Sequence, residues 1–394
     1  MRKADNSHEA AGQSRVGLLI IGGGIMGLWA AVHAERRGID TLLVDGGRIG
    51  HGASGGLLGA LMAHMPDRWS DKKQFQFDAL VSLEEAIRTL ESQTGIASGY
   101  RRTGRLIPLP KEHLRRIAEG HSKDADTNWR AGDRRFGWNV LDSSPFGPTW
   151  PVEEAAAAGL VHDTFAARVF PRSMSALLLG FLETAKRVRI IEGVGVGSID
   201  ARDATASLAS GQQIAFGHCI VAAGYRSFAM LEALGDPLGV PLGQPVKGQA
   251  ALLKVDIDPS WPLLYLDGLY VVPHEGGHVA IGSTSENHFA DPHGTDGKLD
   301  DLIARARLLA PGLSNAEVVE RWAGLRPKAI DRDPMVGPHP DHGRVIALTG
   351  GFKVSFGIAH RLAEAAIAAI DGEMPALPAS FQLASHLEVA ARKT

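Results

Sequence analysis

The chain has 394 residues, of which 44% are hydrophobic, so it is long enough to bury a large core in one fold or in two coupled domains. Its 41 lysines and arginines nearly balance its 44 aspartates and glutamates, which excludes a general electrostatic attraction to nucleic acid or anionic lipid. A single cysteine excludes disulfide bonds within the chain, and no apolar run reaches the roughly 20 residues of a membrane-spanning helix. We therefore expect a cytoplasmic protein that acts on a small molecule, without a nucleic-acid partner, and a homo-oligomer is compatible with these properties.

Residues 18–45 carry the strongest local signal. A short apolar strand is followed by Gly22, Gly24 and Gly27 in GxGxxG spacing, then by a helical pattern and a second strand that ends on Asp45. Gly22 turns the chain, Gly24 lets the backbone approach a pyrophosphate, and Gly27 allows the helix to pack on the strand. The helix N-terminus presents unpaired N–H groups to phosphate, and Asp45 lies at the distance expected of a ribose-binding acid. The pattern predicts a dinucleotide site.

A glycine-rich loop occupies residues 46–66, where short side chains would let the backbone pass close to a long flat ligand. Ser70 and Asp71 then open a helix whose leucines and Ile87 share one face, and Gly95 follows its end. We expect this helix to belong to the core.

Residues 100–150 differ from the preceding segments in their pattern of polar and apolar residues, which suggests an inserted segment. The letters RLIPLP predict a strand, 111–119 a short charged helix, and the remainder a polar loop that contains Trp129 and Trp138. Residues 160–224 return to the first pattern, with a helix, a strand near Arg189 and a second strand that ends at Gly224. We expect these strands to join the sheet of the opening domain.

The spacing of the apolar residues changes between residues 248 and 322. The runs GQAALLKVD, GLYVVP and HVAIGST are separated by glycine, proline and acidic turns, which predicts an antiparallel sheet. A helix over 299–309 follows, and the chain then continues with a strand, a glycine turn and a helix from about Gly357. Cys219 lies in an apolar run and is expected to be a buried small hydrophobe. None of the sixteen histidines has HExxH or similar spacing, so we predict no metal site.

Several of these motifs together resemble the D-amino-acid-oxidase superfamily of FAD enzymes, most closely glycine oxidase and next sarcosine oxidase. The resemblance covers residues 16–370 and rests on these motifs, in chain order: GGGIMGLWAA, GASGG, VAAG, PVKGQ, YVVP, IGSTSE, WAGLRP and GGFK. It implies an α/β Rossmann-type FAD-binding domain interleaved with an α+β substrate domain built on an antiparallel sheet. The division expected is 16–99, 155–235 and 325–375 for the FAD-binding domain, 100–154 and 236–324 for the substrate domain, and 1–15 for a flexible N-terminal tail.

The resemblance also implies which residues hold FAD, here without a covalent bond, because Arg326 stands where sarcosine oxidases carry their flavin-linked cysteine. Asp45 would bind the adenosine ribose, Val196 would meet the adenine, and Ala53 and Ser54 would lie along the pyrophosphate and flavin. The full set of expected cofactor residues is Gly22, Gly24, Ile25, Met26, Gly27, Asp45, Gly46, Ala53, Ser54, Val196, Gly224, Gly351, Phe352, Lys353 and Val354.

For the substrate, Arg326 falls where glycine oxidases carry their carboxylate-binding arginine, and a guanidinium fork matches a carboxylate in two charge-assisted bonds. A structural ion pair of Arg326 with Asp331 or Asp333 is the alternative. Tyr270 falls at the YVVP tyrosine, which in the family also reaches the carboxylate, and Ser285 would stand near the amine or side-chain end of the pocket. Lys353 could bind a second carboxylate, serve the flavin pyrimidine or remain solvated.

The implied reaction is oxidation of the C–N bond of a small amino acid or N-substituted glycine, by hydride transfer to flavin N5, giving an imine and then a carbonyl product. Peroxide forms if oxygen is the acceptor, but Ala280 replaces the lysine thought to assist oxygen in sarcosine oxidases. The alternatives are a D-amino acid or 2-hydroxy acid dehydrogenase that uses a quinone or carrier, a tRNA-modification oxidase, which the lack of a basic surplus disfavours, and a flavin-binding protein without turnover.

Overall fold

The computed structural model describes residues 14–373 and 376–392. The tail expected over 1–15 therefore lies largely outside the described residues, whereas Ser14 and Arg15 already belong to the first strand, β1 (Ser14–Ile21). No described helix is both long and apolar enough to cross a membrane.

A mainly parallel sheet is built from segments that are far apart in the sequence. Its main path runs β10-β2-β1-β13-β12-β11, and β20 continues it by pairing with β13 and β19. The pairs β1 with β2, β1 with β13, β10 with β2, and β13 with β20 are parallel, as expected for strands joined by crossovers. The strands are β2 (Thr41–Val44), β10 (Val188–Ile191), β11 (Val196–Asp200), β12 (Thr205–Leu208), β13 (Gln213–Val221), β19 (Met335–His339) and β20 (His342–Thr349).

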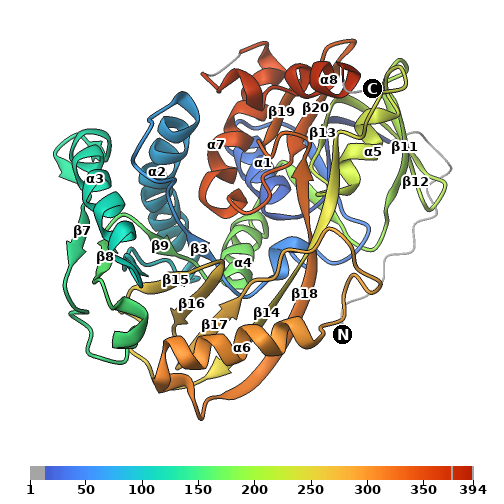
Figure 1. Ribbon diagram of the computed structural model, residues 1–394. Coiled ribbons are helices and arrows are strands. Elements are labelled where there is room, and N and C mark those ends of the chain that lie inside the picture. The colour runs from blue at the N-terminus through green and yellow to red at the C-terminus, as the bar shows by residue number, and fades with distance from the viewer. Residues whose placement is uncertain (1–13, 374–375, 393–394) are drawn as a thin grey trace.

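Helices cover both faces of this sheet (Figure 1). One face packs against α1 (Ile25–Arg36) and α7 (Ser355–Ala368), and α2 (Asp71–Thr94) and α4 (Pro171–Leu182) pack in turn on these helices. The apolar side chains of all four helices form one continuous core with the sheet. The other face packs against α5 (Arg226–Glu232) and α8 (Leu383–Arg392). The helix predicted after the glycine turn, ending before Gly38, and the helix predicted from Ser70 are confirmed, and Gly95 ends α2 in the left-handed conformation that favours glycine.

The second sheet is mostly antiparallel, as predicted, with the order β18-β14-β17-β16-β15-β4-β8-β7. One face packs against α6 (Gly297–Leu309), which lies along the lower side of the sheet in Figure 1. The strands are β4 (Arg105–Pro108), β7 (Trp138–Leu141), β8 (Leu160–Asp163), β14 (Gly243–Lys254), β15 (Leu263–Leu266), β16 (Leu269–His274), β17 (His278–Gly282) and β18 (Glu317–Ala329).

The sheet topology departs from the sequence interpretation in two places. We expected 155–235 to lie with the first sheet, but β8 pairs with β4 and β7 in the second. The boundary at 325 falls inside β18, which is one unbroken strand. Both differences arise because strand pairing is decided by partners distant in the sequence, which local patterns do not reveal.

The segment 100–150 also contains more structure than expected. The predicted short helix continues as α3 (Glu112–Asn128), and Trp129 and Trp138 are buried, not in a polar loop. Their rings pack edge to face with centroids 5.9 Å apart, and they join the core beside α2. The burial of these two large aromatic side chains stabilises the packing of residues 100–150 against the rest of the molecule.

Two histidines tie together the helices behind the first sheet. His33 on α1 donates from Nε2 to the main-chain oxygen of His360 on α7 over 3.0 Å, and His360 Nε2 lies 3.0 Å from the hydroxyl of Ser82 on α2. Burial lowers the pKa of His33 to about 4 and that of His360 to about 3. Both rings are therefore neutral in the folded protein at physiological pH.

We expect the free energy of unfolding to fall on acidification below pH 6.5. The unfolded chain takes up protons on these histidines near pH 6.5, whereas the folded protein does not until about pH 4 or lower, so unfolding gains protons across that window. For His33 alone the loss at pH 5 is about 2 kcal/mol. Urea unfolding of wild type and His33→Gln between pH 8 and 5 measures it, because glutamine keeps a donor but cannot titrate. Parallel pH profiles for the two proteins would contradict the assignment.

Candidate active site

A cavity of about 650 Å³ lies where the two sheets meet. The first sheet contributes the loops at the ends of β1, β2, β13 and β20, and the second contributes side chains of β14, β16 and β18. Helices α1 and α7 begin beside it, so both direct their positive N-terminal ends toward it. The arrangement provides a long space with a glycine-rich wall at one end and a wall of strand side chains at the other.

The glycine turn between β1 and α1 has the tight geometry that its spacing predicts. Gly22 has φ +103, and a Cβ there would lie 2.5 Å from the main-chain oxygen of Ala222. A Cβ on Gly27 would overlap the main-chain oxygen of Gly22. Gly22 and Gly24 line the cavity, whereas Gly27 acts from beneath by letting α1 approach the turn.

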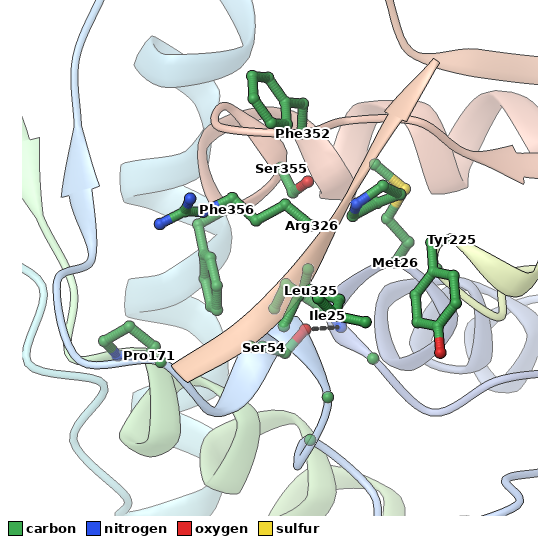
Figure 2. A pocket seen from close by; sticks show the side chains of 18 of the residues that line it. Ile25, Met26, Ser54, Pro171, Tyr225, Leu325, Arg326, Phe352, Ser355 and Phe356 are labelled. Carbon is green, nitrogen blue, oxygen red and sulfur yellow. Dashed lines mark hydrogen bonds between the residues drawn. The ribbon is translucent and has the colours of Figure 1, made fainter. Parts of the chain in front are cut away.

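The start of α1 is held by the loop that follows β2. Ser54, in a short 3₁₀ turn (Ala53–Gly55), accepts a hydrogen bond of 2.9 Å from the N–H of Ile25 (Figure 2). This contact fixes the loop against the helix N-terminus, where the first-turn N–H groups are available to an anion. Ile25, Met26, Ala53 and Ser54 all line the cavity, as the sequence predicts.

Asp45 links the two glycine-rich segments. One carboxylate oxygen accepts from Gly23 N–H and the other from Gly47 N–H, each over 2.7 Å. Because each oxygen can accept more than one hydrogen bond, the carboxylate can still bind a ribose hydroxyl. Gly46 and Val196 line the same end of the cavity.

Of the other residues predicted to contact the cofactor, some line the cavity and one supports a loop behind it. Gly224, Phe352, Lys353 and Val354 line the cavity. Gly351 does not, and a Cβ on it would overlap the end of the Met26 side chain, so this glycine lets the loop before α7 pack on α1.

The charges around the cavity suit an anionic cofactor. Its described wall contains one carboxylate, Asp45, and four cationic side chains, Arg48, Arg226, Arg326 and Lys353. The chain as a whole is slightly acidic, so this excess of positive charge is local. Together with the glycine turn and the helix N-terminus, it fits a dinucleotide that carries a pyrophosphate.

Arg326 extends from β18 into the cavity (Figure 2). Its Nη1 donates to the main-chain oxygen of Thr284 over 3.1 Å, and no carboxylate of the described residues lies within ion-pair distance. Of the two acids considered as partners, Asp333 pairs instead with Lys72 at 2.5 Å. Burial lowers the pKa of Arg326 to about 10, so the guanidinium remains charged at neutral pH. A partly buried cation without a carboxylate partner is the feature expected of an anion-binding group.

Tyr270 and Lys353 also line the cavity. Burial raises the pKa of Tyr270 to about 12, so its hydroxyl is a donor at physiological pH, and its ring packs on Tyr265 with centroids 4.9 Å apart. Burial, and then the nearby charge of Arg326, lower the pKa of Lys353. Its Nζ lies 5.6 Å from the centre of the Phe352 ring, a cation–π distance. Two cations thus face the same space.

The structure does not support the predicted position of Ser285 in the pocket. It is exposed and does not line the cavity, whereas Ser283, two residues earlier, does. The segment leaves β17 at Gly282, so the strand alternation that would place Ser285 on a known face ends before it.

Sequence reasoning also missed Trp322, which lines the cavity from β18. A signal was present, because Trp322, Gly324 and Arg326 alternate along one strand and so share a face. Gly324 is required there, since a Cβ on it would overlap the Trp322 ring. Tyr225, Arg226 and His293 line the cavity as well, and no local pattern indicates them.

Known proteins that bind FAD are similar to this chain along nearly its whole length. Residues 18–365 match the FAD dependent oxidoreductase family. Glycine oxidase of Bacillus licheniformis is 25% identical over 355 residues, covering 86% of this chain and 89% of the relative. Glycine oxidase of Pseudomonas putida is 26% identical over 336 residues, covering 82% and 86%.

Solved structures share the fold. Glycine oxidase of Geobacillus kaustophilus superposes with a TM-score of 0.83 at 22% identity, covering 94% of this chain and 99% of that one. Iminodiacetate oxidase of a Chelativorans species superposes with a TM-score of 0.80 at 21% identity, covering 92% and 97%. With the glycine turn, Asp45 and the cationic cavity, these matches establish that the chain belongs to the FAD dependent oxidoreductase family.

Proposed function

We propose that this FAD-dependent enzyme oxidises the C–N bond of a small amino acid or N-substituted glycine. The observation that carries the proposal is Arg326, a partly buried guanidinium in the cavity without a carboxylate partner among the described residues. A substrate carboxylate would complete it with two parallel charge-assisted hydrogen bonds. The names of the relatives, glycine oxidase and iminodiacetate oxidase, support a substrate of this class.

The bound FAD supplies the redox chemistry, because it accepts the hydride and so the two electrons that leave the substrate carbon. For its binding we propose that Asp45 takes the adenosine ribose, Val196 contacts the adenine, and the glycine turn with Ser54 and the start of α1 takes the pyrophosphate. Phe352 and Val354 would lie beside the ring system. Cys219, the only cysteine of the chain, is fully buried and outside the cavity, which supports non-covalent binding.

The protein side chains would act mainly by orientation. Arg326 and the protonated hydroxyl of Tyr270 would hold the substrate carboxylate, which fixes the position of the α-carbon and removes the entropic cost of alignment. The apolar wall formed by side chains such as Leu57, Leu325 and Phe356 would exclude water from that carbon. The substrate amine must be neutral when it reacts. Water then hydrolyses the imine product to a carbonyl compound. Oxygen or a redox carrier would be the final electron acceptor.

Anaerobic mixing of the holoenzyme with glycine, sarcosine, N-alkylglycines, D-amino acids, iminodiacids and 2-hydroxy acids tests the proposal. We expect the flavin absorbance near 450 nm, a general property of oxidised flavin, to bleach with at least one amino or imino acid. Oxygen consumption compared with reduction of an artificial acceptor then identifies the acceptor class. Bleaching only by hydroxy acids would show that the amine assignment is wrong.

Replacing Arg326 by alanine should nearly abolish flavin reduction by carboxylate-bearing substrates. Loss of one partner of a buried charge pair commonly costs about 2 to 5 kcal/mol, and the substrate also loses its alignment. Stopped-flow reduction rates over a range of substrate concentration measure the effect. Arg326→Lys is the matched control, because it keeps the charge without the fork and should recover only part of the rate. A variant with wild-type kinetics would place the carboxylate elsewhere.

The role of Lys353 is decided by substrates with one and two carboxylates. If Lys353 binds a second carboxylate, Lys353→Met should reduce kcat/KM for iminodiacetate by at least tenfold more than for glycine, because only iminodiacetate loses an ionic contact. Lys353→Arg should retain the preference. Equal losses with both substrates, together with an altered flavin spectrum, would assign Lys353 to the cofactor.

A further inference from the structure

Two sequence motifs, PVKGQ and IGSTSE, lie next to each other beside Arg326. The first is part of β14, and the second begins in the last two residues of β17 and continues beyond it. The main chains of Lys247 and Glu286 exchange two hydrogen bonds of 2.9 Å, which joins the motifs outside the regular ladder. The two segments therefore form one layer beside the arginine.

Thr284 is at the centre of this layer. Its main-chain oxygen accepts the only hydrogen bond that the Arg326 side chain makes within the described chain, at 3.1 Å. Its hydroxyl accepts from the N–H of Gln249 over 2.9 Å and donates to a carboxylate oxygen of Glu286 over 2.6 Å. Thr284 is held at both its hydroxyl and its main chain, so the acceptor that it offers Arg326 has a fixed position.

Glu286 is held in turn by its neighbours. Its buried carboxylate accepts from Gln249 Nε2 over 2.8 Å and from Lys298 Nζ over 2.6 Å. Burial alone would raise the pKa of Glu286, but hydrogen bonds from Lys298, Thr284 and Gln249 outweigh it and lower the pKa. The group therefore stays an acceptor at neutral pH, and the hydroxyl of Thr284 must point its hydrogen at it.

Gly248 confines the guanidinium from a second direction. It lies on β14 opposite Gly324 of β18, and a Cβ added to it would overlap Cζ and both terminal nitrogens of Arg326. The guanidinium thus lies directly over the backbone at this glycine. With Nη1 bonded to Thr284, the Nε and Nη2 groups have no acceptor within the part of the chain that the structure describes.

We infer that Thr284, held by Glu286 and Gln249, is a positioning residue that aims the free N–H groups of Arg326 at the substrate carboxylate, with Gly248 as the seat of the guanidinium. The inference rests on the proposed carboxylate-binding role of Arg326. A long arginine side chain loses conformational entropy when it is held in one rotamer. Because Thr284 already holds Arg326 in the folded protein, this entropy is not lost again when the substrate binds. The layer would thus raise affinity for every carboxylate ligand of the site.

Acetate is a suitable probe, because it carries the carboxylate without the reacting amine. Its dissociation constant is measured on the oxidised holoenzyme from the perturbation of the flavin spectrum. We expect Thr284→Val to raise the dissociation constant of acetate and the KM of the best amino acid about tenfold, which corresponds to about 1.4 kcal/mol, with a smaller change in kcat. Thr284→Ser keeps the hydroxyl and should remain within twofold of wild type.

A matched control separates positioning from general loss of stability. Thr164 also accepts from a main-chain N–H, that of Gly137 at 2.8 Å, but it does not line the cavity. Thr164→Val should lower the melting temperature without changing acetate affinity. If Thr284→Val behaves in the same way as Thr164→Val, the positioning role is overturned.

Gly248→Ala tests the seat independently and does not remove any hydrogen-bonding group. The three atoms nearest to the added methyl all belong to the movable end of Arg326, so we expect normal FAD content but acetate affinity reduced toward that of Arg326→Ala. If Arg326→Ala abolishes acetate binding while Thr284→Val and Gly248→Ala bind it normally, the inference fails and the proposed function stands. If acetate affinity does not depend on Arg326 at all, both are overturned.

Discussion

The site depends on the antiparallel ladder between β14 and β18. It pairs residues from Gly243 opposite Ala329 to Lys254 opposite Glu317, and it is the longest ladder among the described strands. Because side chains alternate along a strand, its register decides that Trp322, Gly324 and Arg326 share one face of the sheet. A shift by one residue would turn the guanidinium to the opposite face. The same strand continues to Lys328, which bridges to Gly351 next to α7, so one register positions both the arginine and the loop that carries Lys353.

Local sequence was sufficient to predict the glycine turn at one end of the cavity. The GxGxxG turn, the helix behind it and Asp45 follow one another within 28 residues, and each glycine has a steric reason that can be read from its spacing. The structure bears out the turn geometry at Gly22 and Gly27. The resemblance to a known family then indicated Arg326 and Tyr270, which do line the same cavity.

Features that depend on distant pairing were beyond the reach of local patterns. The placement of β8 in the second sheet follows from its partners β4 and β7, and nothing in its own letters specifies them. Ser285 was assigned from the family resemblance alone, and in the structure it is exposed and does not line the cavity. Thr284 could not be singled out, since its contacts join three segments: β14, β18 and the stretch after β17.

The order of the strands in the first sheet has a consequence for biosynthesis. β1 is the first described strand to leave the ribosome, but its parallel neighbour β13 begins about 200 residues later, at Gln213, and β20 joins β13 only at residues 345–347. The floor of the cofactor cavity is therefore incomplete until nearly all of the described chain has been synthesised. Contacts of such long sequence separation fold slowly and expose strand edges meanwhile. Until these last strands are made, β1 and then β13 each have an edge that lacks its native partner.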